Sequence, residues 1–301
     1  MSSPGASPPG TAERAAGALY GLAIGDALGM PTESLPRSQV LARYGELVAG
    51  FEPAPPGHPL ADGLPAGAVT DDTEQAVLLA QLLIDGAGRV DGAELARRLL
   101  AWEESMRARG ALSLLGPSTK RAISALLAGT SPDEAGRSGT TNGAAMRIAP
   151  VGIAARADDV DALVDLVVSA SRVTHNTGVA LAGAAAVAAA VSAGISGATL
   201  PEAARAGAAA AALASRRGRW VAAADVAARI TWATGLMTGL GHGAAIDVIV
   251  TLVGTSLATQ ESVPAAFAVL ATSPDDPWLA CRLAASLGGD SDTIGAMAGA
   301  I

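Results

Sequence analysis

The sequence of 301 residues is half apolar but only 3% aromatic, and it carries a formal net charge of −8. The acidic balance argues against a protein that grips the phosphates of nucleic acids, and the few aromatic side chains argue against a platform for stacked bases. The single cysteine, Cys281, excludes an intrachain disulfide framework and a cysteine-based zinc site, so we expect a small buried thiol.

The chain opens with a segment rich in Ser, Pro and Gly that lacks the apolar stretch of a signal peptide. We predict a disordered tail over residues 1–12. Residues 13–301 contain nothing that resembles a linker between two cores, so we predict a single domain there. With no signal peptide in view, we expect a cytoplasmic protein.

Apolar side chains recur at helical spacing along most of this domain. No segment alternates convincingly with the two-residue period of a strand. The predicted class is therefore all-α, a single compact orthogonal helical domain. The predicted helices cover residues 11–28, 38–44, 72–84, 91–107, 118–127, 144–155, 158–171, 175–194, 200–216, 221–238, 243–259, 262–271 and 276–288.

Two stretches depart from this amphipathic pattern. Residues 50–67 are rich in Pro and Gly and have no periodicity, which predicts an irregular loop that forms a lid or a wall facing a substrate. Residues 173–201 contain no charged side chain and are long enough to cross a bilayer. Because they are mostly Ala and Gly and no basic cluster flanks them, we predict a helix buried in a bundle and no membrane span.

Two short acidic clusters stand more than 200 residues apart, and an apolar helical run follows each of them at once. Taken singly, each is typical of a helix cap, because Thr and Asp cap helices and acidic side chains complement the helix dipole. Two matching clusters instead favour one site of hard oxygen ligands for Mg²⁺, Ca²⁺ or Mn²⁺, in which four carboxylates hold two ions. The clusters consist of Thr70, Asp71 and Asp72 and of Asp290, Asp292 and Thr293.

Five motifs follow one another along the chain: GLAIGDALGMPTE at residues 21–33, TDDT at 70–73, GTTNGAAMR at 139–147, THN at 174–176 and GDSDT at 289–293. In this order they resemble the serial motifs of the ADP-ribosylglycohydrolase family. That family includes the dinitrogenase-reductase-activating glycohydrolases and the ADP-ribosyl-acceptor hydrolases. The resemblance runs from about residue 14 to the end of the chain.

The resemblance implies a binuclear centre of two Mg²⁺ or Mn²⁺ ions at the helix starts, held by the two acidic clusters. Such ions would bind the vicinal hydroxyls of a ribose and orient a water near its anomeric carbon. Glu33 is then the candidate to take the proton of that water, or a metal ligand that also gates the site. Asp292 is assigned to catalysis as well as to the metal. Asp26, in the same motif as Glu33, is interpreted as a structural carboxylate that satisfies loop amides.

The same resemblance places a substrate-binding loop at residues 139–147, where glycines let backbone N–H groups approach phosphates or a distal ribose. Two of the implied residues keep an alternative: Arg147 could instead pair with a helix carboxylate, and His175 could be structural. His58 and His242 have no supporting motif. The implied substrate-binding residues are Glu33, Thr141, Asn142, Gly143, Met146, Arg147 and His175.

One departure from the family bears on the substrate. Arginine-specific members carry an Asp shortly before the Gly-x-x-Thr that matches residues 116–119, whereas Ser113, Leu114 and Leu115 stand here. The predicted function is therefore a metal-dependent hydrolase that releases ADP-ribose from an acceptor, with arginine in doubt and serine, a free ADP-ribose derivative or a smaller riboside as candidates. Two alternatives stay open: a nucleoside or riboside hydrolase with the same metals, and a non-catalytic module that binds ADP-ribose. A monomer is the default expectation.

Overall fold

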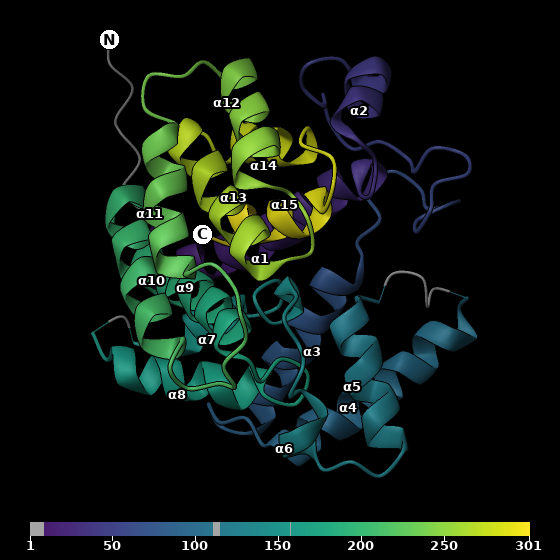
Figure 1. The fold of residues 1–301 in the computed structure, drawn as a ribbon, viewed down its shortest axis with the longest axis vertical. Coiled ribbons are helices and arrows are strands. Elements are labelled where there is room, and N and C mark those ends of the chain that lie inside the picture. Colours follow the sequence, from purple (N-terminus) through teal and green to yellow (C-terminus); the bar gives the residue numbers. More distant parts are fainter. Residues whose placement is uncertain (1–8, 111–114, 157) are drawn as a thin grey trace.

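The computed structural model describes residues 9–110, 115–156 and 158–301. Within these ranges the chain is built from helices, and the only strand-like pairing is two isolated bridges, Thr141 with Ala258 and Thr177 with Arg219. The predicted all-α class is confirmed (Figure 1). The α-helices are α1 (Thr11–Gly29), α2 (Arg37–Tyr44), α3 (Asp71–Asp85), α4 (Gly92–Ala108), α5 (Pro117–Leu127), α6 (Pro132–Ala135), α7 (Ala149–Ala154), α8 (Val160–Ser171), α9 (Gly178–Ile195), α10 (Leu200–Ala214), α11 (Val226–Leu236), α12 (His242–Val248), α13 (Thr259–Thr272), α14 (Pro277–Ala285) and α15 (Ser291–Ala300).

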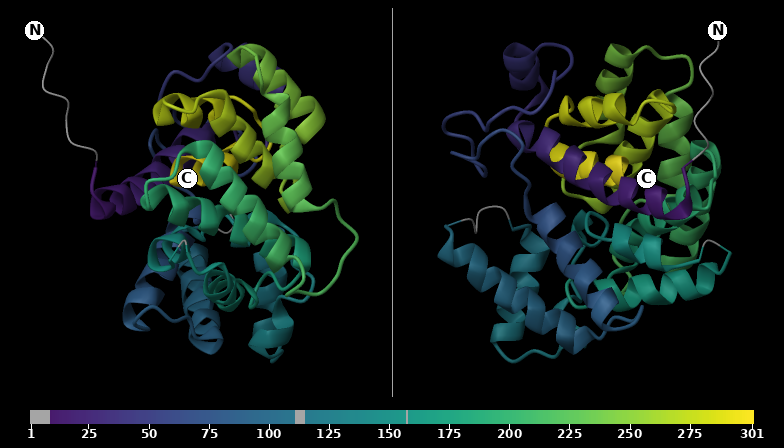
Figure 2. Two further views of the ribbon diagram at one scale, coloured as in Figure 1. Left: turned by 90° about the vertical axis from the view of Figure 1, so that its left-hand side faces the viewer. Right: turned by 180° about the vertical axis from the view of Figure 1, so that it is seen from behind.

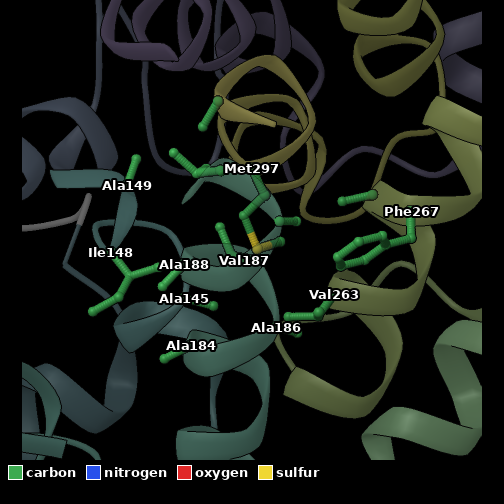
Figure 3. Packing of buried hydrophobic residues seen from close by; sticks show 14 of the residues in the cluster. Ala145, Ile148, Ala149, Ala184, Ala186, Val187, Ala188, Val263, Phe267 and Met297 are labelled. Atoms are coloured by element: carbon green, nitrogen blue, oxygen red, sulfur yellow. The ribbon is translucent and has the colours of Figure 1, made fainter. Parts of the chain in front are cut away.

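Helix α9 forms the centre of the core. It begins three residues later than predicted, because the Thr177 side chain caps it by accepting the N–H of Ala180. Among the described residues it is the one helix long and apolar enough to cross a membrane, with a mean hydropathy of 2.0, and 89% of it is buried inside the protein. Figure 3 shows Val187 of α9 beside Met297 of α15, with Phe267 and Val263 of α13 across from them in the same cluster. The prediction of a helix buried within the bundle is confirmed.

Helices α1 and α15 lie side by side at backbone contact, although they stand at opposite ends of the sequence (Figure 2). A Cβ added to Gly21 would lie 1.9 Å from the carbonyl oxygen of Gly299, and one added to Gly25 would lie 1.9 Å from that of Gly295. Only glycine fits at these crossings, because the obstructing atoms are backbone and cannot move aside. This contact brings the C-terminal end of α1 to the N-terminal end of α15.

The predicted helix over residues 243–259 is wrong over residues 254–258. Helix α12 continues into a π-helical turn, η4 (Ile249–Val253), and ends at Gly254, whose φ of +91° an L side chain rarely adopts. Residues 254–258 are a loop, and α13 starts at Thr259, three residues before the predicted start at 262. The sequence hid this loop because it follows directly on an apolar helical run, with only Gly254 to mark the end of the helix.

Two further predicted helices are shorter than expected. Residues 221–225 precede α11, because Asp225 caps that helix by accepting the N–H of Ala228. The run 144–155 is divided into a 3₁₀ turn, η3 (Asn142–Ala144), and the short α7. Residues 50–67 carry no helix, in agreement with the predicted irregular loop.

Candidate metal centre and substrate cavity

The two acidic clusters occupy the first turns of α3 and α15, and their carboxylates line one cavity. Thr70 is the cap of α3, and its hydroxyl accepts the backbone N–H of Asp72 at 3.4 Å. Asp290 takes the capping position of α15, and Asp292 follows in the first turn. Both helix starts point positive ends of their dipoles toward these carboxylates, which favours negative charge there.

Glu33 lies close to these carboxylates and comes from the segment that follows α1. It follows α1 through a 3₁₀ turn, η1 (Met30–Thr32). Glu33, Asp290 and Asp292 are buried, and each can offer a carboxylate oxygen such that all three atoms lie within 4.8 Å of one another. The Thr32 hydroxyl fixes this segment, because it lies 2.8 Å from the hydroxyl of Ser291 at the start of α15.

A glycine turn and an amide hold Asp290 in place. Gly289 has a φ of +67°, and a Cβ there would lie 2.4 Å from the carbonyl oxygen of Thr255. That same carbonyl accepts the backbone N–H of Asp290 at 2.7 Å. The Asn142 amide donates to the Asp290 carboxylate and, at 2.9 Å, to the hydroxyl of Ser262. Asn142 is therefore positioned by α13 and in turn orients Asp290.

Asp26 holds the start of α3, where Thr70, Asp71 and Asp72 lie, through hydrogen bonds. Its carboxylate accepts the backbone N–H of Thr70 at 3.0 and 3.1 Å and that of Thr73 at 3.1 Å, as well as the Thr73 hydroxyl. The interpretation of Asp26 as a structural carboxylate that satisfies loop amides is confirmed.

The carboxylates are crowded and away from water, and this raises their pKa values. Burial, followed by the charges of Asp26 and Asp290, raises the pKa of Asp71 to about 8, and burial raises that of Asp290 to about 6. Burial and the neighbouring carboxylates also raise the pKa values of Glu33, Asp72 and Asp292.

The donor set fits divalent cations. One oxygen each of Asp72 and Asp292 is buried without a hydrogen-bond partner, which is costly for a carboxylate unless a cation faces it. Closely spaced carboxylate oxygens are the ligands that Mg²⁺ and Mn²⁺ prefer. Asp71, Asp72, Asp290 and Asp292, with the hydroxyl of Thr293, are the residues that would hold such ions.

The raised pKa values predict an unusual pH dependence for the metal-free protein. A carboxyl with a raised folded pKa contributes stability at low pH that is lost as pH rises through that pKa, which is about 8 for Asp71. We expect EDTA-treated protein to lose about 2 kcal/mol of unfolding free energy between pH 6.5 and pH 8.5. Denaturant unfolding at both pH values measures this. Excess Mg²⁺ should remove the loss, and a rise in metal-free stability with pH would contradict the account.

Five buried carboxylates, those of Glu33, Asp71, Asp72, Asp290 and Asp292, form what we call the acidic group. They line a cavity of about 470 Å³, a volume typical of small-molecule sites. Leu60 of the 50–67 loop forms part of its wall, as predicted for that loop. The sequence did not predict that Lys120 and residues 255–257 form part of the wall. The lining comprises Glu33, Ser34, Leu60, Asp71, Asp72, Leu115, Gly116, Pro117, Thr119, Lys120, Thr141, Asn142, Gly143, Met146, Thr255, Ser256, Leu257, Gly289, Asp290, Asp292 and Thr293.

Arg147 and His175 lie behind this wall, which corrects the expectation that they contact a substrate. Arg147 is 1% exposed and donates to the Gln75 amide oxygen at 2.6 Å and to the Thr174 hydroxyl at 2.7 Å. His175 is fully buried, with Nε2 3.1 Å from the hydroxyl of Thr141. Among the described residues no helix carboxylate forms an ion pair with Arg147 either, which contradicts the alternative interpretation of this side chain.

Thr70 does not line the cavity either; its hydroxyl donates to Asp72 at 3.2 Å, and its role as a metal ligand stays a prediction. Of the segment that lacks the expected Asp, Leu115 lines the cavity, while Ser113 and Leu114 lie outside the described residues.

Comparisons with known proteins agree with this site. The family model of the ADP-ribosylglycohydrolases matches residues 7–301. The uncharacterized protein YegU of Escherichia coli (strain K12) is 38% identical over 297 residues, covering 96% of this chain and 86% of that protein. The ADP-ribosyl-dinitrogen reductase glycohydrolase of Rhodospirillum rubrum is 31% identical over 176 residues, covering 56% of this chain and 53% of that enzyme.

A solved structure described as an ADP-ribosylglycohydrolase-related protein complex shares the fold. It superposes with a TM-score of 0.66 at 28% sequence identity and covers 96% of this chain and 86% of that one. The chain therefore belongs to the ADP-ribosylglycohydrolase family, whose members are hydrolases that act on glycosyl bonds.

Proposed function

We propose that the protein is a metal-dependent hydrolase that cleaves the glycosidic bond between ADP-ribose and an acceptor. The observation that carries this proposal is that five buried carboxylates and a cavity of substrate size share the same space. The similarity to the ADP-ribosyl-dinitrogen reductase glycohydrolase of Rhodospirillum rubrum supports ADP-ribose as the sugar half of the substrate.

The residues divide the chemistry between binding and proton transfer. Bound by Asp71, Asp72, Asp290 and Asp292, two cations of the Mg²⁺ or Mn²⁺ type would lower the pKa of a water and hold the ribose hydroxyls. Glu33 takes a proton as the water oxygen bonds to the anomeric carbon. The acceptor leaves with the electron pair of the glycosidic bond and regains a proton from Glu33. The negative charge of the carboxylate group, Asp292 included, favours the oxocarbenium character of the ring in the transition state.

We further propose that the acceptor is not the guanidinium of arginine. Among the described lining residues no carboxylate lies outside the acidic group, and Lys120 is the one Lys or Arg side chain. The sequence of residues 111–115, ALSLL, contains no acidic residue. A cationic acceptor would face Lys120 without a partner, which disfavours it. A neutral or anionic acceptor, such as a serine oxygen or a small O-linked group, avoids that repulsion.

Release of ADP-ribose from matched peptides tests both parts of the proposal. We expect release from an ADP-ribosyl-serine peptide at least about tenfold faster than from the arginine analogue, and Lys120→Glu should narrow that difference. Faster hydrolysis of the arginine peptide by the unsubstituted protein would contradict the acceptor assignment. Hydrolysis of nucleosides with no release of ADP-ribose would instead support the riboside alternative.

A further inference from the structure

A chain of hydrogen-bonded side chains runs behind the cavity. It joins Asp71 of the acidic group to Thr141, which also lines the cavity. Successive links measure 2.9, 2.6, 2.7, 2.7 and 3.1 Å. Every member except Thr141 is buried. In order, the members are Asp71, Gln75, Arg147, Thr174, His175 and Thr141.

Arg147 stands in the middle of this chain and can only donate hydrogen bonds. Among the described residues it is the one buried Arg or Lys side chain. Burial lowers its pKa to about 10, so the guanidinium is still charged at neutral pH. A fixed donor at the centre requires an acceptor on each side, namely the amide oxygen of Gln75 and the hydroxyl oxygen of Thr174.

The first arm ends at the metal centre. Because Arg147 donates, the oxygen of the Gln75 amide must face it, and the amide N–H₂ must face Asp71. The Gln75 N–H₂ then donates to Oδ2 of Asp71 at 2.9 Å. Arg147 thus fixes the orientation of the amide that holds Asp71.

The second arm ends at the cavity wall. The Thr174 hydroxyl accepts from Arg147 and keeps one proton to donate. That proton goes to Nδ1 of His175 at 2.7 Å, because the Ser171 carbonyl lies 3.5 Å away and already accepts the backbone N–H groups of Thr174 and His175. Burial, with the charge of Arg147 behind it, lowers the pKa of His175, so the ring is neutral. Because Nδ1 accepts from Thr174, the ring proton lies on Nε2. That N–H donates to the Thr141 hydroxyl at 3.1 Å.

We propose that Arg147 is a positioning residue that holds the amide oxygen of Gln75 on one arm and the hydroxyl oxygen of Thr174 on the other. Thr174 then donates to His175, and Thr141 presents its hydroxyl proton to the cavity as a donor for a substrate oxygen. Among the described residues no side chain accepts that proton, and Thr141 lines the cavity. The donor suits a phosphate or ribose oxygen of the bound nucleotide. The identity of this ligand rests on the proposed function, whereas the direction of the hydrogen bonds does not.

The imidazole nitrogen resonances of ¹⁵N-labelled protein test the polarity without substrate. The sequence has three histidines, and His175→Gln identifies the signal of interest by its loss. We expect His175 to carry its proton on Nε2. Thr174→Val, which keeps the shape of threonine but removes its hydroxyl, should release this preference, and Thr174→Ser should preserve it. Gln75→Leu, which interrupts the other arm, should leave the tautomer unchanged.

ADP-ribose affinity tests the consequence at the cavity. Thr174→Val should weaken ADP-ribose binding about tenfold while metal affinity stays as in the unsubstituted protein. Thr141→Val should weaken it by a similar factor. The double variant should show no further loss, because both changes remove the same donor. Thr174→Ser serves as the rescue.

Two results would overturn the proposal. One is a proton on Nδ1 of His175 in the unsubstituted protein, and the other is a Thr174→Val variant that binds metal normally but keeps both the tautomer and the affinity for ADP-ribose. If the unsubstituted protein bound no ADP-ribose, the proposed function would fail, and the tautomer measurement would still decide the polarity of the chain.

Discussion

Asp292→Asn is expected to lower kcat/KM by about a thousandfold or more and to abolish tight binding of Mg²⁺, while making the metal-free protein more stable. The opposite signs follow from one cause. The Asp292 carboxylate is buried, has an oxygen without a partner, and its pKa is raised by burial and by the charge of Asp290. Such a group costs stability until a cation faces it. The neutral amide should therefore stabilise the metal-free fold by about 1 kcal/mol at pH 8.

Calorimetric titration with Mg²⁺, thermal unfolding in EDTA and an ADP-ribose release assay measure the three parts of this prediction. Asp161→Asn is the matched control, because Asp161 also lies in the first turn of a helix but is exposed. It should change none of the three. An Asp292→Asn protein that bound Mg²⁺ and turned over normally would remove Asp292 from the metal centre.

Gly25→Ala should destabilise the protein by about 3 kcal/mol and weaken its binding of metal, although the change is one methyl group. The added Cβ would lie 1.9 Å from the carbonyl oxygen of Gly295, so α1 and α15 would have to separate. Asp26 lies on α1, Glu33 follows it, and Asp292 lies on α15, so the separation would move both sides of the acidic group. Denaturant unfolding gives the first effect, and Mg²⁺ titration gives the second.

Gly17→Ala on the same helix is the control for this prediction. A Cβ at Gly17 meets no atom within 4 Å, and alanine favours helix over glycine, so stability should stay level or rise by up to about 1 kcal/mol. Equal effects of the two substitutions would show that helix propensity, and not the α1–α15 contact, governs position 25.

The sequence could predict the acidic group because two separate signals point to the same residues. Each cluster combines residue types that cap helices with oxygen donors that suit a metal, and the motifs around them fix their order. The structure adds the means by which they meet, namely the backbone contact of Gly21 and Gly25 with α15. Glycines four residues apart signal close packing, but nothing in the sequence tells which helix packs there.

The wall of the cavity was harder to predict. Thr255 and Ser256 lie in a loop that ends a long apolar run, and only the φ of Gly254 separates this loop from the helix before it. Arg147 belongs to the substrate-loop motif, yet its side chain turns inward to Gln75. A sequence gives the position of a charged residue along a loop, whereas its direction depends on partners that tertiary packing supplies.

The most direct test of the central claim is calorimetric titration of ADP-ribose into the purified protein, first with Mg²⁺ and then with EDTA. The acidic group and the cavity form one site in this account, so we predict binding with Mg²⁺ that EDTA abolishes. Binding that is equal in both conditions, or absent while Mg²⁺ itself binds, would contradict the claim that this cavity holds ADP-ribose on a metal centre.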